Sequence, residues 1–180
     1  MRIGVAIDVP APWGDQLTGR RAAAGDPQAA YVPAHVTVLG PTEVDAARLD
    51  EIELHLAGVA AQYPPFTLHL RGTGTFRPIT EVVFVAVAAG ISECELIAAA
   101  IHDCAAIELR LRFPYHPHVT VAQDVAAGEL DAVFADLAGF EAQFPVGGFT
   151  LFMHGPDGRW RPRRRYPLTG AGVAPVSGTG

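Results

Sequence analysis

The tetrapeptide His35-Val36-Thr37-Val38 returns unchanged as His118-Val119-Thr120-Val121, so each half of the chain carries one copy. Valine and threonine favour β-strands, and a proline shortly before each copy (Pro33 and Pro117) is compatible with a strand start. Side chains alternate between the two faces of a strand, so the histidine and threonine of each copy share one face. Each copy therefore predicts a strand that buries its valines and presents an imidazole and a hydroxyl on the opposite face.

The composition indicates a folded domain with a packed interior. The chain has 180 residues, of which 49% are hydrophobic and 18% are charged. Every basic residue is an arginine, and the formal net charge is −6. This charge argues against a surface that coats nucleic acid without specificity, because such binding needs a basic surface. A small phosphorylated ligand in a local pocket remains compatible with it.

The two cysteines fall in one predicted helix. Ten residues of helix separate Cys94 from Cys104 by about 15 Å, beyond the roughly 7 Å that a disulfide allows between Cα atoms. We expect reduced core residues, as in a cytosolic protein. The apolar run at residues 1–8 is too short for a signal peptide, and no stretch has the length of a membrane span. The expected location is the cytoplasm, without contact to a membrane.

Hydrophobic patterning predicts an alternation of strands and helices. Strands are expected at residues 2–9, 35–38, 66–71, 82–88, 118–121, 142–146, 149–154 and 160–168, with a short extended segment at 110–113. Helices are expected at residues 13–24, 45–62, 92–107 and 128–137. Gly40-Pro41 should stop the second strand, and Ser92 with Glu95 should form a capping box for the third helix. The order indicates an α+β fold with an approximate internal duplication.

The end of the chain has a different composition from the rest. Residues 170–180 contain only glycine, alanine, valine, proline, serine and threonine, without periodicity. Such a segment cannot bury enough apolar surface to offset its ordering entropy. We therefore expect a single domain at 1–169 and a flexible C-terminal tail at 170–180.

The two His-x-Thr pairs resemble those of the two-histidine phosphoesterases, in particular the bacterial 2′-5′ RNA ligases and RNA 2′,3′-cyclic phosphodiesterases. Supporting similarity lies at residues 2–10, 72–76, 114–123 and 157–168, and the resemblance covers most of residues 1–169. It implies two similar lobes of antiparallel sheet, with outer helices, around a central cleft. His35 and His118 would face each other there.

The chemistry that the resemblance implies suits these residue types. Opening a cyclic phosphate needs a base for the attacking water and an acid for the departing ribose oxygen. Histidine serves both roles because its ordinary pKa, about 6.5, is close to working pH. Thr37 and Thr120 can donate to the non-bridging oxygens, which gain charge in the transition state. The substrate would be RNA or a nucleotide with a 2′,3′-cyclic phosphate, ligation would be the reverse reaction, and no cofactor is needed.

Several further residues are candidates for substrate binding. Gln123 stands five positions after the second histidine, where many family members carry arginine or tyrosine. Phe76 and Tyr115 are candidates for stacking on a base. Arg77 and the Arg159–Arg165 group could supply positive charge, although that group also suits a solvated edge strand. The seven histidines lack the spacing of a zinc site, so no metal site is expected.

The residues alone leave alternatives open. The histidines could be ordinary strand residues, although the presence of two matching pairs argues against this. The cleft could belong to a nucleotide-binding module without turnover, or to a cyclic phosphodiesterase for a small nucleotide metabolite. The sequence does not distinguish the acid from the base, and a monomer is expected.

Overall fold

The computed structural model describes residues 1–108 and 112–171. Its strands are β1 (Arg2–Asp8), β2 (His35–Glu43), β3 (Phe66–Thr75), β4 (Val82–Ala89), β5 (His118–Gln123), β6 (Glu141–Val146), β7 (Gly148–His154) and β8 (Trp160–Pro167). Its α-helices are α1 (Trp13–Ala23), α2 (Leu49–Gln62), α3 (Ile91–His102) and α4 (Ala127–Asp136), and short 3₁₀ turns lie at η1 (Pro27–Ala30) and η2 (Ala46–Arg48).

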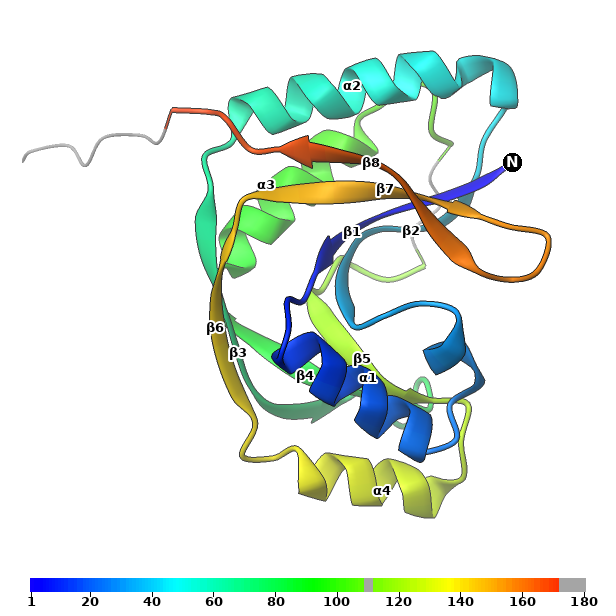
Figure 1. Cartoon of the computed structure of the whole chain (residues 1–180), viewed down its shortest axis with the longest axis vertical. Coiled ribbons are helices and arrows are strands. Elements are labelled where there is room, and N and C mark those ends of the chain that lie inside the picture. Colours follow the sequence, from blue (N-terminus) through cyan, green and yellow to red (C-terminus); the bar gives the residue numbers. More distant parts are fainter. Residues whose placement is uncertain (109–111, 172–180) are drawn as a thin grey trace, which may run out of the picture.

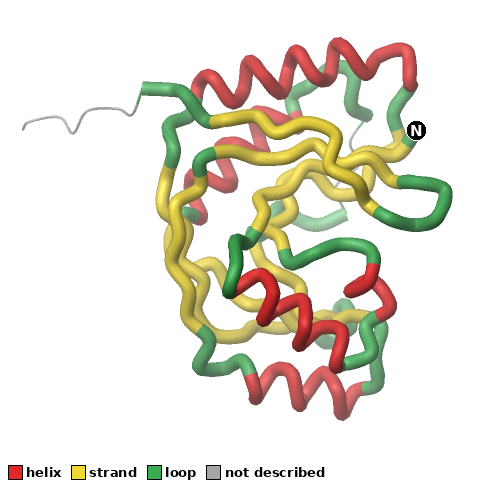
Figure 2. The backbone as a smooth tube through the Cα atoms, viewed as in Figure 1, coloured by secondary structure: helices red, strands yellow, loops and turns green. Residues whose placement is uncertain are grey.

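The strands form two four-stranded antiparallel sheets. The first sheet has the order β2-β1-β7-β8, and the second has the order β5-β4-β3-β6. The two motif strands, β2 and β5, are edge strands of their sheets and contact each other. Figure 1 shows the two sheets as an upper and a lower lobe, and Figure 2 shows how loops connect them. The predicted α+β fold with two antiparallel lobes is confirmed.

The helices are exchanged between the lobes. Helix α1 follows a strand of the first sheet but packs against β5 of the second, beside α4 (Figure 1). Helix α3 follows a strand of the second sheet but packs against β2 of the first, beside α2. Each motif strand is therefore supported by a helix from the other half of the sequence.

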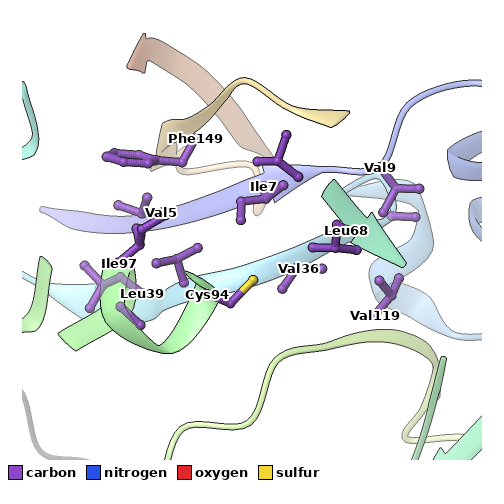
Figure 3. Close-up of a cluster of buried hydrophobic side chains, with 14 of the residues drawn as sticks. Val5, Ile7, Val9, Val36, Leu39, Leu68, Cys94, Ile97, Val119 and Phe149 are labelled. Carbon is purple, nitrogen blue, oxygen red and sulfur yellow. The ribbon is translucent and has the colours of Figure 1, made fainter. Parts of the chain in front are cut away.

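The two motif strands have the same burial pattern. Their histidines and threonines are partly exposed, whereas Val36, Val38, Val119 and Val121 are at most 1% exposed. These valines belong to one continuous core that draws side chains from both sheets and from α3, as Figure 3 shows. Burial of the valine face fixes the register, since a slip of one residue would expose it.

Three strands extend at least two residues beyond their expected ends, and for β5 these are residues 122–123. Strand β2 continues through Gly40 and Pro41 to Glu43, with an irregular register against β1 at that point. Pro41 is tolerated because an edge strand does not need every N–H group for pairing. Strand β3 likewise continues through Gly72, where a left-handed φ of +67° accompanies a register shift.

The bounds expected for the third helix are wrong at both ends. Helix α3 begins at Ile91 after Gly90, whose φ is +91°, and no side chain caps it. The capping box of Ser92 is therefore not formed. The helix ends at His102, so Cys104 lies after it rather than within it. Both cysteines are buried and unpaired, as expected.

The described chain ends against α2. The N–H groups of Thr169 and Gly170 donate to the carbonyls of Ala60 and Tyr63. Most of the predicted tail and half of the extended segment expected at 110–113 lie outside the described residues, and residues 112–113 form a bend rather than a strand. Within the described ranges, no helix is both long and apolar enough to cross a membrane.

Candidate active site

His35 opens β2 with its ring fixed by the backbone. Its Nδ1 lies 2.7 Å from the carbonyl oxygen of Pro33. A carbonyl can only accept, so Nδ1 carries the hydrogen of this bond. The other ring nitrogen, Nε2, is then the atom at which the proton comes and goes.

His118 opens β5 in the same way. Its Nδ1 lies 2.7 Å from the carbonyl oxygen of His116, again two residues earlier in the chain. The same reasoning places the hydrogen on Nδ1 and leaves Nε2 as the exchanging nitrogen. The two histidines thus share tautomer, strand position and backbone anchor, which the repeated sequence produces twice.

Burial lowers the pKa of His35 below its ordinary value. Loss of hydration is the largest cause, and the hydrogen bond to Pro33 opposes it. The nearby positive charge of Arg21 lowers the pKa further, whereas the negative charge of Asp8 raises it. The neutral, base-competent imidazole is therefore favoured in the free protein.

The pKa of His118 is also lowered, and burial is again the main cause. The bond to His116 opposes this shift, and positive charge on His116 or on His35 adds to it. His35 and His118 are thus close enough for the proton on one to oppose a proton on the other. An anionic phosphate between them would favour protonation instead, because an opposite charge stabilises the imidazolium.

Aromatic rings surround His118. The ring of Phe76 lies edge-on at 5.0 Å between centroids, and that of Phe84 lies at 5.2 Å. Phe84 also contacts Phe76, at 4.5 Å, and packs over Gly74, where a Cβ atom would come within 2.5 Å of the Phe84 ring. This packing restricts the orientation of the imidazole.

A cleft of about 420 Å³ lies on one face of the first sheet and extends to β5. Thr37 and His35 line it from β2, and Thr120 and Gln123 line it from β5. His118 stands two residues before Thr120 and so shares its strand face. The cleft thus brings together both threonines, one histidine and Gln123, and the charge coupling places the second histidine nearby.

The two aromatic candidates make contacts within the protein. Phe76 packs against His118, and the Tyr115 hydroxyl donates to the carbonyl of Thr37 at 2.9 Å. Among the described residues that line the cleft, neither ring is present. Their stacking on a base stays a prediction.

Sequence reasoning missed the buried cation of the cleft. Arg21 lines it, is only 5% exposed, and donates from Nε to Asp26 at 2.7 Å. Arg77, a candidate from the sequence, instead pairs with Asp131 at 2.7 Å. The sequence does not show which of Arg20 and Arg21 is buried, because the burial of Arg21 results from the packing of α1.

Other lining residues were also missed. Gly4 and Ala6 of β1, Phe152 and His154 of β7, and Trp160 of β8 lie on the cleft side of the first sheet. Their alternation along each strand could have grouped them, but only the sheet order shows that β1, β7 and β8 lie in the same sheet as β2. Residues 1–108 and 112–171 contain no group of three histidine, cysteine or acidic side chains that could hold a metal ion.

Comparison with known proteins agrees with this geometry. The family model of the 2′-5′ RNA ligase superfamily matches residues 8–158. A protein of Bacillus mycoides (strain KBAB4), named as a candidate phosphoesterase, is 28% identical over 174 residues, which cover 93% of this chain and 97% of the relative.

Solved structures show the same architecture. TT0787 of Thermus thermophilus is similar with a TM-score of 0.66 and 23% identity, covering 94% of this chain and 99% of that chain. E. coli LigT complexed with NADP⁺ is similar with a TM-score of 0.64 and 27% identity. The match covers 93% of this chain and 98% of the LigT chain. LigT has also been solved with ATP. The family model covers most of the sequence, and the chain therefore belongs to the 2′-5′ RNA ligase superfamily of two-histidine phosphoesterases.

Proposed function

We propose that this protein opens 2′,3′-cyclic phosphates at the ends of RNA or oligonucleotides by acid–base catalysis between His35 and His118, without a metal ion. The observation that carries the proposal is the matched anchoring of the two imidazoles. Each is held through Nδ1 by a carbonyl two residues earlier, so each offers Nε2 for proton transfer. The NADP⁺ and ATP complexes of E. coli LigT support a nucleotide as the ligand.

The reaction needs one neutral and one protonated histidine. The Nε2 of the neutral ring accepts a proton from water as the water oxygen attacks phosphorus. The Nε2–H of the protonated ring donates its proton to the ribose oxygen as the P–O bond breaks. Two fixed groups in one cleft replace collisions with solvent acids and bases, which removes much of the entropic cost.

Thr37 and Thr120 stabilise the charge that develops on the non-bridging oxygens. Both residues line the cleft, on the same strand faces as the histidines. Their hydrogen bonds strengthen as the phosphorane gains charge, so they act mainly on kcat. Arg21 also lines the cleft, and its charge lowers the pKa of His35.

With a ribose 5′-hydroxyl in place of the attacking water, the same groups serve ligation. The hydroxyl of one RNA end attacks the cyclic phosphate of another, and the strain of the ring supplies the free energy. The proposal therefore includes 2′-5′ ligation as a second outcome at the same site.

The test is hydrolysis of 2′,3′-cyclic nucleotides and of cyclic-ended oligonucleotides in EDTA, with the product phosphate isomer identified. We expect turnover that EDTA does not reduce and a single product isomer, because the acid reaches only one ribose oxygen. Nucleotide binding without turnover would favour a binding module. Turnover only of a small cyclic metabolite would favour a metabolite phosphodiesterase.

A further inference from the structure

A single line of residues crosses the cleft side of the first sheet. Thr37 on β2 pairs with Ala6 on β1, Ala6 pairs with Thr150 on β7, and Thr150 pairs with Arg165 on β8. Strands lie about 4.8 Å apart, so this line separates the Thr37 backbone from that of Arg165 by about 14 Å. Ala6 and Thr150, which lie between Thr37 and Arg165, have small side chains that rise little above the sheet.

Arg165 points to the cleft side of the sheet. Its neighbours Arg163 and Arg164 both pair with Glu53 of α2, and Arg164 lies over the ring of Tyr166. Arg165 is the cross-strand partner of Thr150, and paired residues of neighbouring antiparallel strands share a face, so Arg165 lies on the face of Thr150. The Thr150 hydroxyl donates to the carboxylate of Asp8, which lines the cleft.

A second hollow, also of about 420 Å³, lies at this end of the line. It shares Asp8, Phe152 and Trp160 with the cleft, so the two hollows adjoin on the sheet. Arg165 lines it together with Arg163 and Arg164. The ring of Trp160 stands between the two hollows and packs against the backbone at Gly4, where a Cβ atom would come within 3.3 Å of it.

The charges in the second hollow favour an anion. Arg163 and Arg164 share one carboxylate, that of Glu53. Within the described ranges, Arg165 makes no ion pair, and Asp8 is the acidic residue that lines the hollow. Positive charge therefore remains in excess here, on a chain whose net charge is −6.

We propose that Trp160 and Arg165 form a second nucleotide subsite, which binds the phosphodiester and base next to the cyclic end of an oligonucleotide. This subsite rests on the proposed function of the cleft. A ligand whose cyclic phosphate lies at His35 and Thr37 reaches Arg165 only if it extends across β1 and β7. The neighbouring phosphodiester supplies the charge for Arg165, and the indole offers a stacking face for a base. A mononucleotide is too short to use it.

The test compares ligands of two lengths by titration calorimetry. The probes are 2′-UMP and a uridine trinucleotide with a terminal 2′-phosphate, which resemble the products of breaking the bond to the 3′-oxygen and are not cleaved. We expect wild type to bind the trinucleotide about 10-fold more tightly. Arg165→Gln should remove this advantage and leave the affinity for 2′-UMP within about twofold. The salt slope for the trinucleotide should fall by about 0.7.

Two variants serve as controls. Arg161→Gln removes the same charge from β8, but Arg161 pairs with Asp157 at the hairpin and lines neither hollow. It should keep the trinucleotide advantage. Arg165→Lys keeps the charge and should retain the salt slope. Equal affinity of wild type for both probes, no binding of either, or an equal loss on both in Arg165→Gln would overturn the proposal.

Turnover separates this inference from the proposed function. Tighter, Arg165-dependent binding of the trinucleotide together with no cyclic phosphodiesterase activity would refute the proposed function and support the subsite. Turnover of cyclic ends with equal kcat/KM for mononucleotide and trinucleotide would refute the subsite and leave the proposed function intact.

Discussion

The hydroxyl of Tyr115 donates a 2.9 Å hydrogen bond to the backbone carbonyl of Thr37, and so joins the segment before β5 to the start of β2. Burial raises the pKa of Tyr115, so the hydroxyl keeps its proton and stays a donor. The bond connects the two lobes directly. It fixes the distance between them at the level of Thr37.

Removing this hydroxyl should loosen the cleft. Tyr115→Phe leaves the Thr37 carbonyl without its partner, which we expect to lower the free energy of unfolding by about 1–2 kcal/mol and to reduce kcat. Urea denaturation and steady-state kinetics measure both. Tyr31→Phe, at an exposed tyrosine, is the control and should change neither. An unchanged stability of Tyr115→Phe would show that the bond contributes nothing.

Gly74 should be sensitive to a single added methyl group. Its Cβ would lie 2.5 Å from the ring of Phe84, which packs on His118. Gly74→Ala should displace that ring, lower stability by about 1–3 kcal/mol and reduce turnover through His118. Gly128→Ala in α4 is the control, because no heavy atom lies within 4 Å of the added carbon, and it should stabilise by up to about 1 kcal/mol. Full activity of Gly74→Ala would contradict this packing role.

The lowered pKa values of His35 and His118 predict a loss of stability in mild acid. Both imidazoles bind protons less readily in the folded chain, so the unfolded chain binds more protons between their folded pKa values and about 6.5. Their contribution to stability is therefore complete above about pH 6.5 and falls as the pH drops through that window. Urea denaturation from about pH 8 to about pH 5 should show a flatter profile for a His35→Asn/His118→Asn double variant. His102, whose pKa is also lowered, remains in both proteins. If the stability of wild type and of the double variant changed equally with pH, the effect could not be assigned to His35 and His118.

The buried pair of Arg21 and Asp26 should be costly to break. Asp26→Asn leaves the guanidinium buried without a counter-charge, and we expect a loss of about 3–5 kcal/mol in thermal or urea unfolding. The control is Asp136→Asn, which breaks the more exposed pair with Arg20 and should cost less than about 1 kcal/mol. Similar losses of stability in the two variants would mean that burial does not make the Arg21–Asp26 pair costlier to break than the exposed pair.

The repeated tetrapeptide predicted the centre of the fold correctly because its signal is local. Strand propensity and alternation place the valines in the core and the His-x-Thr faces opposite them, and both strands show this pattern. The ends of elements were less predictable. Gly40-Pro41 does not stop β2, since an edge strand needs fewer N–H groups, and Gly90 starts α3 before Ser92 can cap it.

Features that depend on long-range packing could not be predicted. The exchange of α1 and α3 between lobes buries Arg21 at the cleft, whereas its neighbour Arg20 stays partly exposed and pairs with α4. The line from Thr37 to Arg165 likewise depends on the sheet order β2-β1-β7-β8, which joins strands from both ends of the chain. Local patterns contain no information on either.

The most direct test of the two-histidine site is the hydrolysis of a 2′,3′-cyclic nucleotide by His35→Ala and His118→Ala, each measured separately in EDTA. Loss of either proton-transfer group should reduce kcat by about 10²–10⁴-fold, while the fold remains intact by circular dichroism. Wild type should show a bell-shaped pH profile, and each variant should lose one of its limbs. Turnover that survives either substitution would contradict the account, and would reduce the repeated motif to a pair of structural strands.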